Sequence, residues 1–245
     1  MILSHANIED LADAILKDYL GSLPTDVKHI RPIDIEAFAA RFLGLNVAYT
    51  RLSDNGDVLG LTTYADVEVK LERYLDTQLI KVPKNTVLID ESLIMPFSQP
   101  DKNKGRRRFT ISHECAHQIL YRQEPMERQE SLLRQFNGRS FSLRELATKE
   151  DWNEWQANAL GAALIMPPSS IALLMQRYAK QRRLVSYENH FAYSDKLVLS
   201  LVCGALEVSR TALVIRLRQL GYVEDKPLSE FTDPMEVVKD ENDDI

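Results

Sequence analysis

One short motif constrains this sequence more than any other feature. Within residues 109–121, FTISHECAHQILY, the residues His113, Glu114 and His117 spell H-E-x-x-H. Positions i and i+4 of an α-helix lie about 40° apart around the axis and about 6 Å apart along it, so one metal ion can bridge both imidazoles. Glu114 projects about 100° away from His113, which lets its carboxylate reach a water molecule beside the metal. Two ligands and a base on one helical turn are the chemistry of a metallohydrolase.

The alternative interpretation is a surface helix that carries two histidines by chance. The flanking residues Phe109, Ile111, Ile119 and Leu120 are apolar, so we expect the helix to be at least half buried. Two buried histidines need polar partners or a metal ion. A site with two histidines is also incomplete, and a third ligand should lie elsewhere in the chain.

Length and composition allow one large domain, or one domain with a small appendage. The chain has 245 residues, of which 44% are hydrophobic, so it can bury a full core. Its two cysteines, Cys115 and Cys203, are too few for a disulfide framework and are better explained as small buried residues. The N-terminus lacks the pattern of a secretion signal, and no apolar run approaches 18 residues. We therefore expect a soluble, cytoplasmic protein without membrane contact.

Charge is concentrated at the C-terminal end. The net charge is −6, but residues 223–245 hold nine acidic residues and two lysines, so the first 222 residues sum to +1. Such a tail, which is also poor in apolar residues, is predicted to be disordered. The basic run at 101–108, DKNKGRRR, is interpreted as a solvated loop before the motif helix, with contact to nucleic acid or an acidic substrate as the alternative.

The N-terminal half predicts helices followed by strands. A first helix covers residues 8–20 with Asn7 as its N-cap, and a second runs from Pro32 to Phe42 with Gly44 beyond its end. The turn signal DNGD at 54–57 predicts a hairpin of strands 45–51 and 58–63. Further strands are expected at 67–71, 78–82 and 86–90.

A second informative stretch, EDWNEWQANALGAALIMPP at 150–168, predicts a helix that stops at the two prolines. Glu154, Asn158 and Gly161 fall on one stripe, with small residues after the carboxylate. A neighbouring helix that brought the two histidines opposite Glu154 would complete a His₂Glu site with water in the fourth position. The alternative for Glu154 is an ordinary first-turn acid favoured by the helix dipole. Asn158 is a candidate to orient a ligand, and Tyr121 is expected to pack beside the site.

The segments RRRFTISHECAHQIL and NEWQANALGAALIMP together resemble the ImmA/IrrE type of bacterial metallopeptidase. By that resemblance His113, His117 and Glu154 are the metal ligands and Glu114 is the general base. Gln156 stands where many members have a second glutamate, which favours Glu154 as the ligand. The family implies an α+β fold, in which a small twisted sheet packs on helices, with a zincin-like active-site helix and a helical C-terminal part. Its members are intracellular proteases that cleave helix-turn-helix repressors, and such a repressor is the expected protein substrate.

These residues predict zinc-dependent peptide hydrolysis. Zinc lowers the pKa of bound water to about 7, and Glu114 takes the proton and later passes it to the leaving amine. Zn²⁺ is preferred, although Mn²⁺ or another divalent ion suits the same ligands. The sequence assigns no second oxyanion donor, and Tyr187, His190 and Tyr193 are candidates without support from spacing. An extended substrate is expected to add to a sheet edge near 58–63 or 86–90.

The C-terminal part, residues 195–222, resembles a helix-turn-helix with a net charge of +2. Contact with DNA and simple packing against the peptidase domain are both compatible with that charge. We therefore predict a peptidase domain at 1–188, a small helical module at 189–222 and the tail at 223–245. The competing functions are a DNA-binding regulator with a structural or inactive metal site and a zinc hydrolase acting on small amides. The sequence does not fix an oligomeric state.

Overall fold

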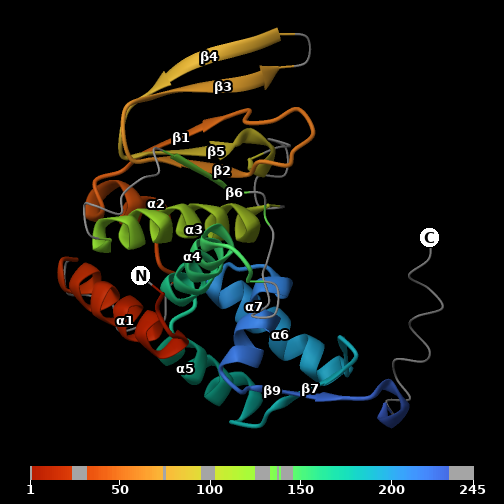
Figure 1. Ribbon diagram of the computed structural model, residues 1–245. Helices are drawn as coiled ribbons and strands as arrows, with labels where there is room; N and C mark the ends of the chain where they lie inside the picture. The colour runs from red at the N-terminus through yellow and green to blue at the C-terminus, as the bar shows by residue number, and fades with distance from the viewer. Residues whose placement is uncertain are drawn as a thin grey trace. The chain divides into compact units, whose positions relative to one another are not determined.

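The computed structural model describes residues 2–23, 32–73, 76–94, 103–124, 133–136, 138 and 146–231. The chain divides into two compact units, one of Met1–Lys28 and Pro32–Pro167 and the other of His29–Arg31 and Pro168–Ile245. Helices and small sheets occur together, so the predicted α+β class is confirmed (Figure 1). The predicted boundary after residue 188 falls within the second unit.

The first unit contains the strands and helices that surround the H-E-x-x-H motif. Its helical elements are α1 (His5–Gly21), α2 (Ile35–Ala37), the π-helical turn η1 (Phe38–Phe42), the 3-10 turn η2 (Glu91–Leu93), α3 (Lys104–Gln123) and α4 (Lys149–Ile165). Its strands are β1 (Asn46–Thr50), β2 (Gly60–Thr63), β3 (Val67–Arg73), β4 (Asp76–Val82), β5 (Thr86–Asp90) and β6 (Leu133–Phe136). The predicted motif helix is α3, and the helix predicted from 150 to the prolines is α4.

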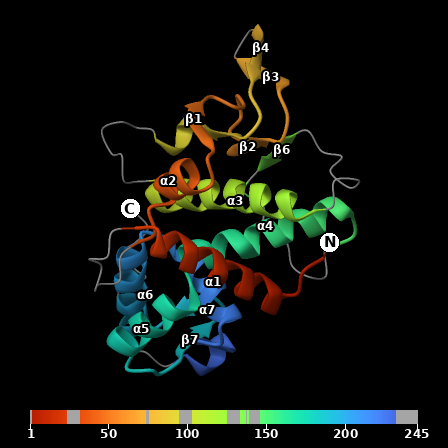
Figure 2. The ribbon, with the colours of Figure 1, turned by 90° about the vertical axis from the view of Figure 1, so that its left-hand side faces the viewer.

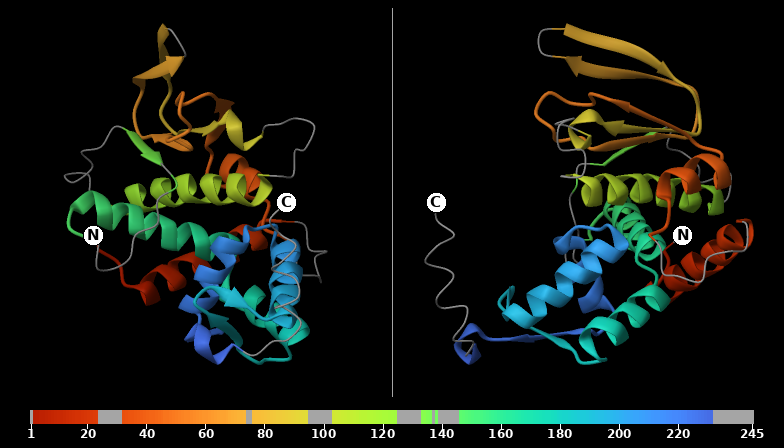
Figure 3. Two further views of the ribbon diagram at one scale, coloured as in Figure 1. Left: turned by 90° about the vertical axis from the view of Figure 1, so that its right-hand side faces the viewer. Right: turned by 180° about the vertical axis from the view of Figure 1, so that it is seen from behind.

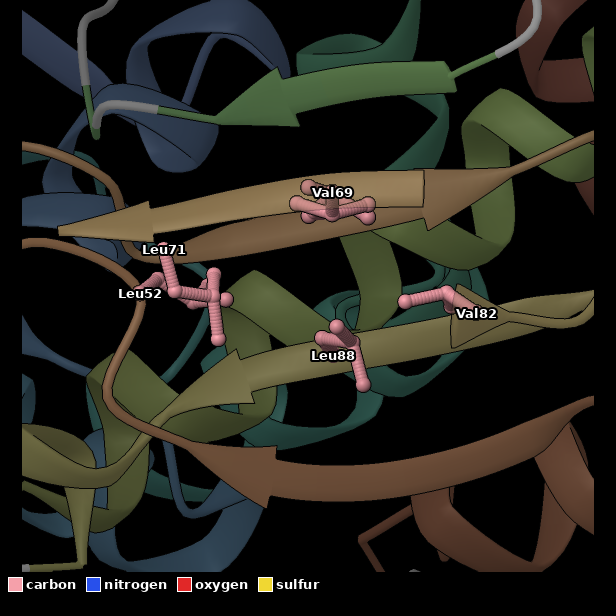
Figure 4. Packing of buried hydrophobic residues seen from close by; sticks show 6 residues of the cluster. Leu52, Val69, Leu71, Val82 and Leu88 are labelled. Carbon is pink, nitrogen blue, oxygen red and sulfur yellow. The ribbon is translucent and has the colours of Figure 1, made fainter. Parts of the chain in front are cut away.

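Four of these strands form a sheet in the order β1-β5-β2-β6, in which only the β1–β5 pair is parallel. Alternate residues of β2 serve opposite faces. Thr62 faces α3, where Gln118 Nε2 donates to its hydroxyl at 2.8 Å. Leu61 faces the other way and packs with Leu71 and Val82 of the β3–β4 hairpin (Figure 4). The sheet is thus enclosed between the hairpin and α3.

Two predictions about this sheet are wrong. Strands β1 and β2 do not form a hairpin, because β5 lies between them and pairs with both. The DNGD turn still forms, since Val58 N donates to Ser53 Oγ at 3.1 Å. An incoming peptide also cannot add at β2 or β5, because both strands have partners on each side. Among the described strands of this sheet, β1 and β6 are the edges.

The helices of the first unit lie in layers below the sheet, with α4 between α3 and α1 (Figures 1 and 2). Helix α1 begins with a capping box in which the Ser4 side chain accepts from Asn7 N, so Ser4 and not Asn7 is the N-cap. Helix α4 has an equivalent box formed by Thr148 and Asp151. A capping box satisfies free backbone N–H groups at a helix start, which fixes where α4 begins and therefore where Glu154 lies.

The basic run before the motif is part of a helix and not a loop in the described residues, because α3 begins at Lys104. Arg108 is buried, and its guanidinium donates to the Ile33 carbonyl at 2.7 Å. Arg107 lies near Glu36 of α2, with 3.9 Å between Nε and Oε1. These two arginines therefore connect α3 to residues 33–36, which lie much earlier in the sequence.

The second unit is a small helical module with a three-stranded sheet (Figure 3). It consists of α5 (Pro168–Ala179), β7 (Leu184–Tyr187), β8 (His190–Phe191), α6 (Tyr193–Leu206), α7 (Arg210–Gln219), β9 (Val223–Lys226) and the 3-10 turn η5 (Leu228–Glu230). Helices α6 and α7 meet at a left-handed Glu207, and Ser209 caps α7 by accepting from Ala212 N.

The first residues of the predicted disordered tail are ordered. Strand β9 pairs in parallel with β7, and Asp225 accepts from the Arg218 guanidinium at 2.8 Å. Composition alone missed this segment because its order comes from pairing with a strand far away in the sequence. Residues 232–245 of the tail lie outside the described residues.

Within the described part of the chain, no helix taken singly has the length and apolar character needed to cross a membrane. Two bent pairs of consecutive helices reach that length and composition only in combination.

Candidate metal centre

The motif residues project from the middle of α3 into the interior of the first unit. His113 and Glu114 are completely buried, and His117 is 2% exposed. The two imidazole rings are 4.5 Å apart between centroids and nearly perpendicular. This arrangement is what the i, i+4 spacing predicts for two side chains on one helical face.

Helix α4 brings Glu154 to the same point. His113 Nε2 lies 3.2 Å from Glu154 Oε2, and His117 Nε2 lies 3.1 Å from Glu154 Oε1. The approach is close because α4 presents a glycine to α3: a Cβ on Gly161 would come within 3.1 Å of both His113 N and His113 Cα. Ser112 Oγ also donates to the Gly161 carbonyl at 2.8 Å. The small residues after Glu154 therefore allow the two helices to bring the three side chains together.

The donor set fits a divalent cation. One ligand atom from each of His113, His117 and Glu154 can be chosen so that all lie within 4.8 Å of one another. A tetrahedral ion with bonds of about 2.0–2.1 Å separates its ligand atoms by about 3.3 Å. Neither imidazole Nε2 forms a hydrogen bond of normal geometry to a described residue, although the carboxylate is so near. We interpret the short distances as convergence of all three groups on one point.

Asn158 strengthens this interpretation. His113 Nδ1 lies 3.0 Å from Asn158 Oδ1, an atom that can only accept, so Nδ1 carries the proton. In its neutral form His113 then has a lone pair on Nε2, which faces the Glu154 carboxylate. The Nε2 lone pair of His113 and the Glu154 carboxylate are both acceptors, and they face each other in a buried site. A cation between them would bind both and remove their repulsion.

The protonation states also suit metal binding. Burial and the neighbouring His113 lower the pKa of His117 to about 4, so its imidazole is neutral at physiological pH. Burial alone would raise the pKa of Glu154, but the interactions with His113 and His117 outweigh it and lower that pKa. Neutral imidazole and ionised carboxylate are the forms that bind a metal ion.

Glu114 occupies a different environment from Glu154. No described residue forms a hydrogen bond with either of its carboxyl oxygens. Burial is the largest cause that raises the pKa of Glu114 well above its usual value, and the negative charge of Glu154 adds to it. The carboxyl fits against β2 only because residue 60 is glycine, since a Cβ there would overlap Oε1. Glu114 therefore lies beside the metal ligands and has a high affinity for a proton, as a general base requires.

Strand β6 supplies two site residues that the sequence did not indicate. The Phe136 ring stacks on the His113 imidazole with 3.8 Å between centroids. Arg134 lines a cavity together with His117 and Tyr64. Both residues belong to the connection between the two motif helices, in which β6 (Leu133–Phe136) is the only described strand. A strand of four residues is too short to give a periodic pattern in the sequence.

Tyr121 lines the same cavity as His117 and stacks on Tyr64 at 3.8 Å between centroids. Gln156 is buried and accepts from Leu3 N at 2.7 Å, so it anchors the start of the chain. The three candidate oxyanion donors all belong to the second unit; they are Tyr187, His190 and Tyr193.

Two of the four lysines and arginines in residues 195–222 are engaged within the second unit. Arg216 of α7 is 1% exposed. Arg218 donates to Asp225, Ser186 and Asn189. Arg210 lies over the Phe191 ring at 5.7 Å from its centroid and remains exposed. The charges of Arg216 and Arg218 are therefore held within the module, whereas the charge of Arg210 is accessible to solvent.

Residues 97–198 match the family model described as the IrrE N-terminal-like domain, peptidase M78. The matched segment begins before α3 and includes α4, so it covers all four residues discussed above. The predicted resemblance to the ImmA/IrrE type is thereby confirmed. The search of curated proteins gave no match to the chain.

Proposed function

We propose that this chain, which carries an IrrE N-terminal-like peptidase domain, is a zinc-dependent endopeptidase that acts inside the cell. His113, His117 and Glu154 would hold the ion, and Glu114 would be the general base. The observation that carries the proposal is the convergence of three ligand atoms from two helices, with Glu114 on the same turn as both imidazoles. Mn²⁺ or another divalent ion would suit the same ligands.

When bound, the ion supplies Lewis acidity, which makes water more acidic and the peptide carbonyl more electrophilic. Glu114 accepts the proton of the attacking water, because its carboxylate has no competing hydrogen bond from a described residue. It then returns that proton to the departing amine. Asn158 and Phe136 hold the His113 ring in a single orientation through its Nδ1 and its face.

The proposed substrate is a helix-turn-helix transcriptional repressor, whose cleavage would relieve repression. The resemblance of the two motif segments to the ImmA/IrrE type supports this class of substrate. Strand β6 is the sheet edge that adjoins the ligands, since Phe136 contacts His113. An extended segment of the repressor would pair with β6, in place of the β2 and β5 edges expected from the sequence.

The direct test incubates the purified protein with Zn²⁺, Mn²⁺ and other divalent ions and with candidate repressors, including one encoded by a neighbouring gene. Wild type should release two fragments from one repressor in a metal-dependent manner. Glu114→Gln should keep the metal and lose cleavage, whereas His117→Ala should lose both. Cleavage by Glu114→Gln would contradict the proposed role of that residue. Hydrolysis confined to small amides would replace the peptidase with a small-molecule hydrolase.

The competing function is a DNA-binding regulator with a structural metal. The engagement of Arg216 and Arg218 within the second unit weighs against it. A mobility-shift assay with salt titration separates the two functions, because binding through phosphates weakens steeply as salt increases. Specific retardation of DNA without repressor cleavage would favour the regulator.

A further inference from the structure

Peptide hydrolysis places negative charge on the carbonyl oxygen as water adds to it. Fixed hydrogen-bond donors directed at that oxygen commonly contribute the largest single part of catalysis. Glu114 cannot serve, because it accepts the proton of the water. A side-chain donor beside the ligands that could reach this oxygen has not yet been assigned.

The register of β6 directs Arg134 toward the ligands. Arg134 pairs with Thr62 and Phe136 pairs with Gly60, and paired residues share a face of the sheet. That face is the one next to α3, where Phe136 stacks on His113 and Gly60 contacts Glu114. Leu133, one residue earlier, packs with the core beneath the hairpin on the opposite face.

Arg134 also lines the cavity that opens beside His117. Tyr64 lines the same cavity and forms a side-chain hydrogen bond with Arg134. The Tyr64 ring is in turn stacked on Tyr121, with 8° between the ring planes. The guanidinium is therefore held at the cavity wall by a tyrosine whose own ring is fixed.

Arg134 lies on the same face of β6 as Phe136, which stacks on His113, and it lines a cavity together with His117. An arginine is always protonated in a protein and presents its donors in a planar fork, which suits an oxygen that gains negative charge.

We propose that Arg134 is a catalytic residue that donates a hydrogen bond to the peptide carbonyl oxygen as it becomes an oxyanion, and that Tyr64 is its positioning residue. This assignment rests on the proposed peptidase function and supplies the donor that the sequence left open. Tyr187, His190 and Tyr193 are not needed for it.

The test compares Arg134→Gln and Arg134→Lys with a control on the same strand, Gln135→Ala. Gln135 is exposed and pairs with Leu61, so its side chain lies on the face away from α3. Zinc content, thermal unfolding and cleavage of fluorescently labelled casein are measured for each protein. A phosphoramidate dipeptide is titrated calorimetrically, because its tetrahedral phosphoryl group mimics the oxyanion without turnover.

Arg134→Gln should lower kcat about 100-fold with KM within about threefold, as expected for loss of one oxyanion donor. Affinity for the phosphoramidate should fall by a similar factor, whereas zinc content and Tm stay at the wild-type values. Arg134→Lys should recover part of both losses, and Tyr64→Phe should weaken phosphoramidate binding less than Arg134→Gln. The Gln135→Ala control should match wild type throughout.

The outcomes that contradict the assignment are distinct from those that contradict the peptidase function. If wild type holds zinc but binds the phosphoramidate no more tightly than Arg134→Gln does, the assignment of Arg134 fails and the proposed function stands. Loss of zinc together with a lower Tm in Arg134→Gln would make the residue structural and would also overturn the assignment. A wild-type protein without bound metal would overturn the peptidase function first, and the role of Arg134 with it.

Discussion

The carboxyl group of Glu114 occupies the space in which a side chain at Gly60 would begin. A Cβ built on Gly60 would overlap Glu114 Oε1 and would lie 2.9 Å from Thr110 Cγ2. Any other residue at position 60 would therefore require the Glu114 and Thr110 side chains to shift. The contact fixes the carboxyl beside the metal ligands, so one methyl group should be enough to disturb it.

Gly60→Ala is expected to reduce cleavage strongly while the protein still binds metal. The new Cβ must push Glu114 aside, and a displacement of about 1 Å can cost about 100-fold in rate. Overpacking should also lower the free energy of unfolding by about 1–3 kcal/mol. Repressor cleavage, zinc content and urea unfolding measure the three effects. Gly204→Ala is the matched control, because its added Cβ would meet no described atom within 4 Å apart from its chain neighbours and the nearby backbone of its own helix. Unchanged cleavage in Gly60→Ala would show that the carboxyl does not need this position.

Gly161→Ala tests the approach of α4 to α3. The added Cβ would lie 3.1 Å from His113 N and Cα, which are backbone atoms and cannot rotate away. Helix α4 should shift outward and carry Glu154 away from the imidazoles. We expect zinc affinity to fall by about tenfold or more, as for other changes that misorient a ligand. Competition with a chelator measures that affinity, and wild-type affinity in Gly161→Ala would mean that the helices tolerate a wider separation.

Asn158→Ala tests whether the hydrogen bond to His113 Nδ1 orients the ligand. Removal of such a partner typically costs about 10–100-fold in metal affinity. Asn158→Asp keeps an acceptor at the same position, so it should restore binding to at least the wild-type level. The same chelator competition gives the result for both variants. Equal losses in the alanine and aspartate variants would contradict an orienting role, since only one of them lacks the acceptor.

The sequence predicted those parts of the site that depend on local spacing. His113, Glu114 and His117 share one helix, and their relation follows from helical geometry. The prediction for Glu154 depended on the stripe of small residues after it. Gly161 in that stripe indicates that another helix packs closely, but it does not indicate which helix. The capping box of Thr148 and Asp151 is also a local signal, because it follows the S/T-x-x-D/E pattern.

What the sequence did not predict depends on pairing between distant segments. The parallel pairing of β1 with β5 overrode the hairpin expected from the DNGD turn, because a turn signal does not determine which strand becomes the neighbour. Arg134 and Phe136 reach the site through the register of a four-residue strand, which is too short for a periodic signal. The role of Gly60 depends on its contact with Glu114 and Thr110 of α3, which no local pattern in the sequence indicates.

Glu114→Gln should stabilise the metal-free protein, and by an amount that grows with pH. Because Glu114 has a raised pKa in the folded state, the folded protein keeps a proton that the unfolded chain releases above about pH 4.5. The unfolded state then binds fewer protons, so the wild-type free energy of unfolding falls as pH rises. Glutamine has no such proton, and the variant lacks this slope. His117 contributes a slope of the opposite sign between about pH 4 and 6.5, but it does so in both proteins and cancels in the difference.

The difference should grow by up to about 1.4 kcal/mol for each pH unit over which folded Glu114 stays protonated and unfolded Glu114 is ionised. Urea unfolding of both proteins in the presence of a chelator, at pH 5 and at pH 8, measures it. At pH 5 the two curves should lie close together, because folded Glu114 and unfolded Glu114 are then more nearly alike in protonation. A difference that stayed constant between the two pH values would mean that the Glu114 carboxyl is already ionised in the folded protein. In that case Glu114 would be an ionised carboxylate, and hence a base, even before a cation binds beside it.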